Sequence, residues 1–370
     1  MSNIVFVSHY SGKGGANKEL CLLIEELIKK GNKIYVVMPS KGWLYDKLNK
    51  KCTCIVQRYY RWVENCNASL IIFRRIVKWG MNWLVAYRLA IYFKNKNIDI
   101  VHTNDSITVV GAYLAQLLHK RHVWHMREIF DGQLEFKHTF SEKYCEKWMQ
   151  RADCIISISK AVYDRYSQYQ KLNLKLVYDG IKCCNKQPQN CINGKLVLLF
   201  CGGTSYDKGF ADVLDIAERM ENEQIDFLIR IVSTCNVDGK LKKYLEKKHI
   251  ENRIEFLGFV DNLDEIREQS DATLMCSSSE AFGLVTVESM LAKRLVIGRA
   301  GGATSELIID GVTGFLYNNI DEMFNCIKKI RSEETKKIVE RAFQYASEQF
   351  NIEKTAQKIQ DIYEEGKYNE

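Results

Sequence analysis

The stretch that sets the fold is residues 3–31, "NIVFVSHYSGKGGANKELCLLIEELIKKG". It opens with an apolar run, Ile4 to Ser8, and continues through a glycine-rich turn into apolar residues at helical spacing from about Glu19 to Lys30. Gly31 ends that pattern, and the next run, "KIYVVMP", has the composition of a buried strand. The order strand, helix, strand predicts the start of a parallel sheet covered by helices.

The glycine turn does not have the chemistry of the common phosphate-binding loops. With Lys18 as the phosphate lysine, Asn17 stands where a P-loop needs glycine, and Glu19 where it needs the hydroxyl that holds magnesium. The glycines also miss the G-x-G-x-x-G spacing of dinucleotide-binding turns. The turn therefore predicts neither an ATPase nor a dehydrogenase.

Length and composition restrict the class of protein. A chain of 370 residues is longer than one core usually serves, so we expect two domains. No apolar run is long enough to span a membrane and no signal peptide is recognised, so we expect a cytoplasmic protein. The 13 cysteines are odd in number and form no C-x-x-C pair, which favours free thiols over disulfides or a zinc site.

The charge is unevenly divided along the chain. Residues 1–185 contain 29 Lys and Arg against 15 Asp and Glu, whereas the remainder contains 24 against 31. The first half is therefore +14 and the second −7. A strongly basic half predicts a polyanionic partner, which is an anionic membrane surface or nucleic acid.

Short apolar runs alternate with helical patterns throughout the chain. The expected strands after the first two lie within 98–105, 122–128, 154–159, 195–203, 225–233, 253–260, 272–278, 294–300 and 314–318. Periodicity is lost only over the polar stretch 182–195, which we interpret as a linker. The pattern predicts an α/β protein with two doubly wound, Rossmann-like domains facing across a ligand-binding cleft.

The basic stretch 58–96 interleaves aromatic residues with Arg and Lys. One side of a helix in it would carry Leu70, Ile71, Phe73, Ile76, Val77, Trp83, Leu84 and Tyr87. This composition favours a helix lying in an anionic membrane interface. The alternative is two ordinary amphipathic helices packed on the sheet. Nucleic acid is a weaker match, because no recognisable binding module accompanies the charges.

Two carboxylates seven residues apart mark the segment "SSSEAFGLVTVESMLAKRLVIG", 277–298. If a strand ends near Ser277 and a helix begins near Val285, Glu280 follows the strand and Glu288 lies in the first helical turn. Backbone N–H groups at the start of that helix would then meet anionic or hydroxyl oxygens. The plainer interpretation is that Glu288 complements the helix dipole and Glu280 is a solvated loop residue.

The segment "SEAFGLVTVESMLA" closely resembles the E-x7-E motif of the family-4 (GT4) retaining glycosyltransferases, which have the GT-B fold. Other matches to this family follow in the expected order: "LVYDGI", "YDKGFADVLDIAERM", "FLGFVDNLDEI" and "GATSELIIDGVTGFLY". The resemblance covers nearly the whole chain. It implies an N-terminal acceptor domain over 1–184, with the C-terminal helix 350–370 packed on it, and a nucleotide-sugar donor domain over 190–349.

The resemblance also implies roles for individual residues. Glu280 would hold hydroxyls of the donor sugar, Glu288 the ribose hydroxyls and Lys208 the diphosphate. Backbone N–H groups of Phe282, Gly283, Leu284 and Val285 would bind sugar and phosphate oxygens, and Gly14 and Gly15 would form the turn beside the phosphates and the acceptor. A cation and a helix terminus stabilise a departing diphosphate without metal, so neither a metal nor a cofactor is expected.

Two departures from the family pattern concern the site. Gly203 stands where the family has an arginine five residues before the lysine, so either Lys208 acts alone or another cation, with Arg299 as the candidate, replaces the arginine. The usual His-Asp pair after the fourth strand is replaced by "HMRE". One hypothesis places His125 or Arg127 near the donor sugar, and the alternative is a histidine that binds only backbone groups at the end of a strand.

The expected function is transfer of a sugar from a nucleotide-diphosphate donor, taken as a UDP-sugar, to a lipid-linked glycan in bacterial capsule or O-antigen biosynthesis. The enzyme would work at the inner face of the cell membrane, without nucleic acid as a partner. The alternatives are a UDP-sugar 2-epimerase of the same fold, and a nucleic-acid-binding protein on an inactive transferase scaffold.

Overall fold

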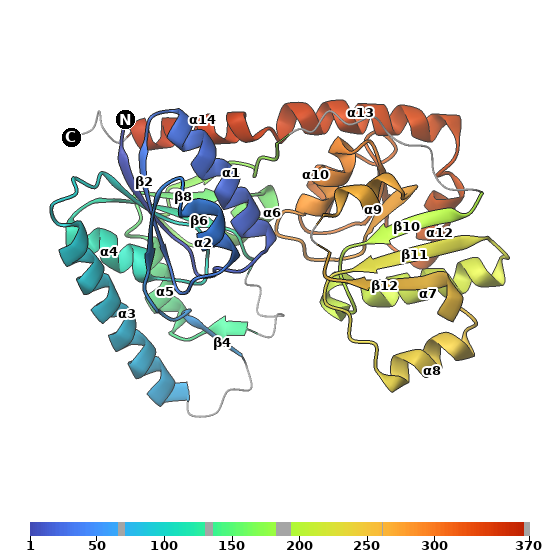
Figure 1. Cartoon of the computed structure of the whole chain (residues 1–370), viewed down its shortest axis with the longest axis horizontal. Helices are drawn as coiled ribbons and strands as arrows, with labels where there is room; N and C mark the ends of the chain where they lie inside the picture. Colours follow the sequence, from blue (N-terminus) through green and yellow to red (C-terminus); the bar gives the residue numbers. More distant parts are fainter. Residues whose placement is uncertain (66–70, 130–135, 183–193, 261, 366–370) are drawn as a thin grey trace. The chain divides into compact units, whose positions relative to one another are not determined.

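The computed structural model describes residues 1–65, 71–129, 136–182, 194–260 and 262–365 (Figure 1). The chain divides into two compact units, one made of Met1–Lys182 with Ile352–Glu370 and the other of Cys183–Asn351. Most of the expected linker lies at 183–193, outside the described residues, as do residues 66–70 of the basic aromatic stretch.

The first unit is built on a parallel sheet with the strand order β3-β2-β1-β5-β6-β8-β9. Its strands are β1 (Asn3–Val7), β2 (Lys33–Met38), β3 (Thr53–Val56), β5 (Ile100–Thr103), β6 (Arg121–Met126), β8 (Cys154–Ser157) and β9 (Leu174–Leu176). A separate antiparallel pair joins β4 (Val63–Asn65) to β7 (Phe136–His138). The buried strands lie in the apolar runs that the sequence singled out.

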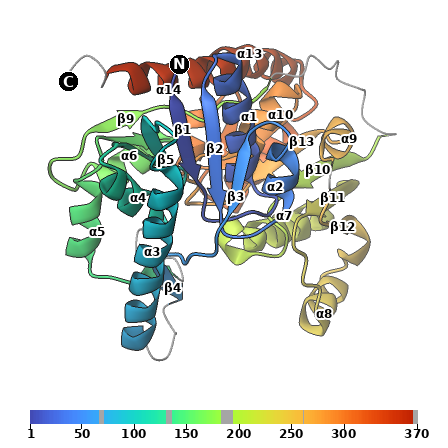
Figure 2. The same ribbon diagram turned by 60° about the vertical axis from the view of Figure 1, so that its left-hand side comes forward.

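Helices cover both faces of this sheet (Figure 2). They are α1 (Gly15–Lys29), α2 (Trp43–Leu48), α3 (Ile71–Phe93), α4 (Val110–Leu118), α5 (Glu142–Met149), α6 (Lys160–Tyr166) and α14 (Ile352–Glu365). Successive residues of a strand point to opposite faces, so Ile4 and Phe6 pack with α1, α2 and α14, while Val5 and Val7 pack with α3 and α4. Two-sided burial explains why the strands are apolar throughout.

The second unit repeats the architecture with the strand order β12-β11-β10-β13-β14-β15. Its strands are β10 (Leu196–Phe200), β11 (Phe227–Val232), β12 (Ile254–Gly258), β13 (Ala272–Met275), β14 (Leu295–Arg299) and β15 (Phe315–Tyr317). Its helices are η1 (Tyr206–Lys208), α7 (Phe210–Asn222), α8 (Gly239–Lys247), η2 (Glu251–Arg253), α9 (Asp264–Glu268), α10 (Leu284–Leu291), α11 (Thr304–Leu307), α12 (Ile320–Lys328) and α13 (Glu333–Gln349). In both units the early strands are added on one side of the first strand, and the later strands on its other side. In parallel sheets of this kind, ligands bind at the carboxyl ends of the strands where the order changes side.

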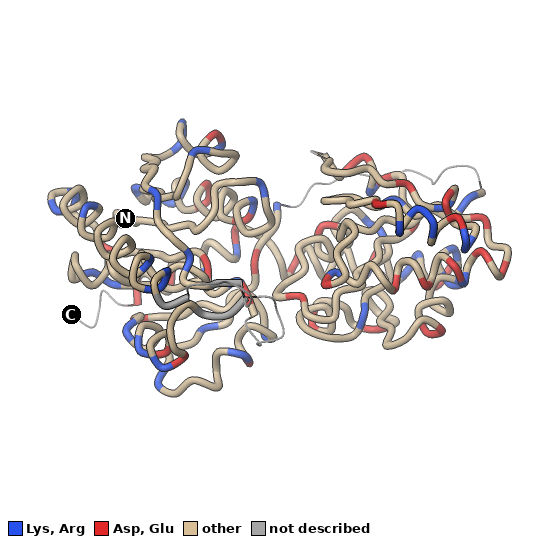
Figure 3. Tube along the Cα trace, turned by 90° about the horizontal axis from the view of Figure 1, so that it is seen from below, with Lys and Arg blue, Asp and Glu red and all other residues tan. Residues whose placement is uncertain are grey.

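The described part of the basic aromatic stretch contains one helix, α3, and not the two helices of the alternative. One face of α3 packs on the sheet through Val85, Leu89 and Phe93. Its strongly exposed large apolar side chains are Phe73, Ile76, Val77, Trp79, Met81, Leu84, Tyr87, Ile91 and Tyr92. Trp83 was expected on that surface but stacks on Tyr113 of α4, with ring centroids 4.3 Å apart. Basic residues are spread over the first unit, whereas the second mixes both signs (Figure 3).

Candidate active site

Two neighbouring strands of the second unit deliver a lysine and a glutamate to the same edge of the sheet. Lys208 ends η1 after β10, and Glu280 follows β13, which pairs with β10. Lys208 Nζ lies 2.7 Å from Glu280 Oε1. The lysine side chain is 49% exposed and that of Glu280 14%, so the pair is accessible from solvent at the edge where ligands of such sheets bind.

Glycines let the loops around this pair approach one another closely. Gly209 has φ +80°, and a Cβ there would lie 2.1 Å from the carbonyl oxygen of Cys276. At Gly302 a Cβ would lie 2.8 Å from the carbonyl oxygen of Glu280. The backbones of the loops that follow β10, β13 and β14 are therefore in close contact. This packing fixes the position of the Glu280 backbone, from which its side chain extends.

Glu288, the second carboxylate of the motif, is held by an arginine from another helix. Arg267 of α9 is buried and donates through Nη2 to Glu288 Oε2 at 2.7 Å, and through Nη1 to Asp264 at 3.1 Å. A buried guanidinium with two carboxylate partners fixes the orientation of Glu288. Nothing in the sequence pointed to Arg267, because an arginine on a short amphipathic helix normally faces water.

The expected helix after Glu280 begins one residue earlier than predicted, at Leu284. Glu288 therefore lies in its second turn, and the expectation of a first-turn position was wrong. Gly283 precedes the helix with φ +94°, a conformation that favours glycine. Phe282 is buried and packs on Phe350, with ring centroids 5.8 Å apart, so only its backbone is positioned to meet a ligand.

Arg299, the candidate replacement for the missing arginine, has an ion-pair partner of its own. Its Nη1 lies 2.8 Å from both carboxylate oxygens of Asp212 in α7, and Asp212 also accepts a hydrogen bond from Tyr317 at 2.8 Å. Gly203 has φ +59°, and a Cβ there would lie 2.2 Å from the carbonyl oxygen of Thr234. An arginine at 203 would therefore require a different loop.

In the first unit, the glycine turn after β1 is held together by Asn17. The Asn17 amide donates to the carbonyl oxygens of Tyr10 at 3.1 Å and of Gly12 at 2.8 Å. Gly14 precedes α1 in an extended conformation, and Gly15 is the first residue of that helix. A Cβ on Gly14 would meet only Tyr10, at 4.0 Å, so the unit itself does not crowd this position.

His125 is the last residue but one of β6 and Arg127 follows the strand directly, but both side chains are buried. Arg127 donates to Asn104 Oδ1 at 3.0 Å, to Asp179 Oδ2 at 2.7 Å and to Glu19 Oε2. His125 is completely buried and packs edge-on against His102, with ring centroids 5.3 Å apart. Burial, followed by the charge of Arg127, lowers the pKa of His125 well below its usual range, so the ring is neutral.

One guanidinium thus faces two carboxylates in a buried space. Burial raises the pKa of Glu19 to about 8, Arg127 opposes that rise, and the second negative charge of Asp179 adds to it. Burial likewise raises the pKa of Asp179. The cluster connects α1, the loop after β5 and the segment after β9. This arrangement favours a structural role for Arg127 over contact with a sugar.

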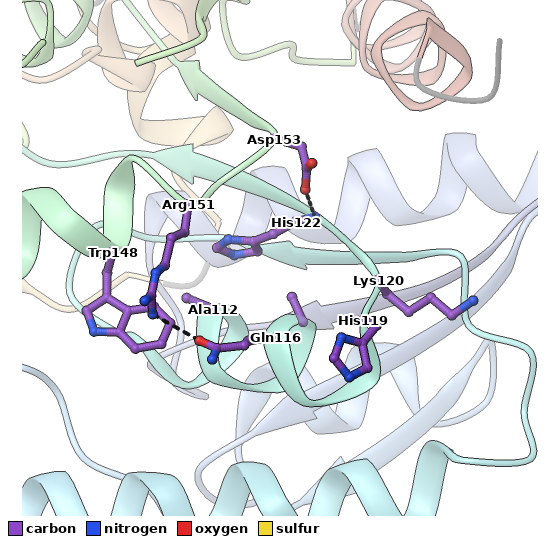
Figure 4. Close-up of a pocket in the computed structure, with 9 residues that line it drawn as sticks. Ala112, Gln116, His119, Lys120, His122, Trp148, Arg151 and Asp153 are labelled. Carbon is purple, nitrogen blue, oxygen red and sulfur yellow. Dashed lines mark hydrogen bonds between the residues drawn. The ribbon is translucent and has the colours of Figure 1, made fainter. Parts of the chain in front are cut away.

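A cavity of about 360 Å³ lies at the opposite edge of the sheet, near the start of β6 (Figure 4). Several of its polar groups bind one another: Arg151 donates to Gln116 at 3.1 Å and stacks on Trp148, and the backbone N–H of His122 donates to Asp153 at 2.7 Å. Because these groups are already engaged, the cavity offers less for a substrate than the carboxyl edge does.

Within the described ranges, no group of three His, Cys, Asp or Glu side chains is placed to hold a metal ion. The nine described cysteines are free thiols. Among the helices that the structure describes, none combines the length and the apolar character that crossing a membrane requires.

Two family models match the chain: "Glycosyltransferase Family 4" over residues 13–183 and "Glycosyl transferases group 1" over residues 185–350. An uncharacterized glycosyltransferase of Methanocaldococcus jannaschii is 27% identical over 299 residues, which are 77% of this chain and 81% of that protein. An uncharacterized 41.2 kDa protein from the cps region of Klebsiella pneumoniae is 29% identical over 251 residues, 61% of this chain and 66% of that protein. HepE of Anabaena, solved in complex with UDP and glucose, superimposes with a TM-score of 0.79 at 20% identity, covering 99% of this chain and 100% of that one.

Two Rossmann-like units with these matches define a glycosyltransferase of the GT-B fold. The chain belongs to the family-4 type of these enzymes.

Proposed function

We propose that the second unit binds a UDP-sugar and that the enzyme transfers the sugar to a lipid-linked glycan in the biosynthesis of a bacterial surface polysaccharide. The observation that carries the donor part is the exposed Lys208–Glu280 pair at the carboxyl edge of its sheet. An ammonium group suits a diphosphate, and a carboxylate suits sugar hydroxyls. The likeness to HepE, which binds UDP and glucose, supports this choice of donor.

The pair also suggests how the donor is recognised. Before the donor arrives, the charge of Lys208 is neutralised by Glu280 at 2.7 Å. A diphosphate competes for the ammonium group, and its arrival releases the carboxylate to accept hydrogen bonds from the sugar. Both groups thus change partners together, so only a ligand with diphosphate and sugar satisfies both.

Two further elements would complete the donor site. Glu288, oriented by Arg267, would accept the ribose hydroxyls, and the backbone N–H groups from Phe282 to Val285 would bind oxygens of the phosphates and the sugar. In the first unit, the turn containing Gly14 and Gly15 would meet the acceptor.

The acceptor part rests on the outer surface of α3. Nine large apolar side chains are strongly exposed on this one helix, beside Arg and Lys in a half-chain of net charge +14. Such a surface suits the interface of an anionic bilayer, where a lipid-linked glycan is presented at the cytoplasmic face. The name of the Klebsiella relative, from a cps region, agrees with a role in surface polysaccharide.

The donor site is tested by release of nucleoside diphosphate from UDP-, GDP- and dTDP-sugars, with Glu280→Ala and Lys208→Ala as variants. The matched controls are Glu333→Ala and Lys336→Ala, which remove an exposed Lys–Glu pair from α13 of the same unit. We expect one donor to be turned over, both site variants to abolish turnover and both controls to retain it. Isomerised sugar without transfer would indicate the epimerase instead.

A further inference from the structure

A histidine, an aspartate and a glutamate meet at the carboxyl edge of the first unit, outside every role assigned so far. His9 follows β1, Asp105 follows β5 and Glu128 follows β6, three adjacent strands of the sheet. His9 Nδ1 lies 3.4 Å from Asp105 Oδ2. The His9 side chain is 14% exposed and Asp105 is completely buried, so the imidazole is the member of the pair that a ligand can reach.

The backbone holds Asp105 in place for this contact. Its Oδ1 accepts hydrogen bonds from the N–H groups of Ile107 at 2.9 Å and Thr108 at 2.6 Å, while its Oδ2 accepts one from the N–H of His9 at 3.1 Å. A carboxylate fixed in this way favours the hydrogen on Nδ1 of the imidazole. Nε2, on the opposite edge of the ring, is then a hydrogen-bond acceptor.

Four influences set the charge of His9. Burial lowers its pKa, the carboxylates of Asp105 and then Glu128 raise it, and Arg61 lowers it slightly; the net shift is upward. Glu128 is itself anchored by the backbone N–H of Ser106 at 2.7 Å. The imidazole therefore keeps its proton to a higher pH than an ordinary histidine, and Nε2 accepts a hydrogen bond only when the ring is neutral.

We propose that His9 binds the acceptor hydroxyl through Nε2, with Asp105 and Glu128 as positioning residues. The proposal deepens the proposed function and rests on it, since it names the group that orients the nucleophile of the transfer. The ligand class is a sugar or other alcohol whose hydroxyl hydrogen points at Nε2. His125, although it lies in the motif that resembles the family, is too deeply buried for this role.

The kinetic test measures nucleoside diphosphate release between about pH 5 and pH 9, with octyl β-D-glucoside as the hydroxyl-bearing probe. We expect wild-type kcat/KM for the probe to fall on acidification, which forms the acid limb of the pH profile. His9→Gln should lower kcat/KM about tenfold and abolish this acid limb. Asp105→Asn moves the limb to lower pH, and Arg61→Ala moves it to higher pH. His119→Asn, which changes an exposed histidine at the other sheet edge, leaves rate and limb unchanged (Figure 4).

The second test follows the imidazole resonances of labelled histidine by NMR and needs no turnover. We expect octyl β-D-glucoside to shift the His9 resonance, and Asp105→Asn to lower its pKa. An unmoved His9 resonance, or an acid limb that survives in His9→Gln, overturns the proposal. If His9 responds to the probe while UDP, GDP and dTDP all fail to bind, the proposed donor function fails and the hydroxyl site stands.

Discussion

Replacing Arg127 tests whether the buried cluster at the carboxyl edge of the first unit holds the fold together. Arg127→Met removes the only cation that contacts Glu19 and Asp179 within the described cluster. All three side chains are at most 3% exposed, so water cannot take over the role of the guanidinium. The variant therefore leaves two carboxylates in a buried space without their counter-charge.

The expected decrease in the free energy of unfolding is the cost of breaking a buried ion pair, which is about 3–5 kcal/mol when one partner is removed. For a unit of this size, each kcal/mol shifts the midpoint of thermal unfolding by about 2–4 °C, so the midpoint should fall by roughly 6–20 °C. Protonation of Glu19, whose pKa is about 8, limits the loss of stability, so the low end of the range is expected below about pH 8.

Tryptophan fluorescence in urea is a suitable assay, because all six tryptophans lie in the first 182 residues and report on the first unit alone. The control is Arg151→Met, which removes a guanidinium of the same unit from the rim of the cavity in Figure 4. We expect its cost to stay below about 1 kcal/mol. Adding Glu19→Gln and Asp179→Asn to Arg127→Met should restore part of the lost stability, because no buried charge then remains unpaired.

The reasoning is refuted if Arg127→Met unfolds within about 1 kcal/mol of wild type. If that stable variant also loses turnover, Arg127 contacts substrate, as the sequence motif first suggested, and the cluster is not what holds this edge of the sheet.

Three more outcomes are expected. The folded-state pKa of Glu19, about 8, lies above its ordinary value of 4.5, so the first unit should lose stability as pH rises between these values, and Glu19→Gln should flatten that slope in urea titrations from pH 5 to pH 8. Glu280→Gln should bind UDP several-fold more tightly by calorimetry while turnover falls, because Lys208 loses its competing partner; weaker UDP binding would count against the exchange of partners. The double change Phe73→Ser and Ile76→Ser on α3 should reduce co-sedimentation with anionic vesicles by at least fivefold, and equal binding would remove the membrane surface from the proposal.

The positions of the candidate donor-site residues in the fold could be predicted from the sequence, because each lies in a short local segment. The E-x7-E motif, the glycines and the lysine each lie in a short segment just after a predicted strand, and the carboxyl ends of parallel strands meet at one edge. The pairing of Lys208 with Glu280, 72 residues apart, follows once β10 and β13 are neighbours. The start of α10, expected near Val285, lies at Leu284, because the glycine before it marks the end of the loop.

The sequence by itself determined the alternation of strands and helices, the two Rossmann-like domains and the family, because hydrophobic periodicity and motif spacing are properties of neighbouring residues. Only the tertiary structure decided that Arg127 is buried between two carboxylates, that Arg267 holds Glu288, and that His9 meets Asp105. These contacts join residues from 21 to 108 positions apart. Whether a charged side chain reaches water or a buried partner depends on which strands lie side by side. Residue type alone does not determine that strand order.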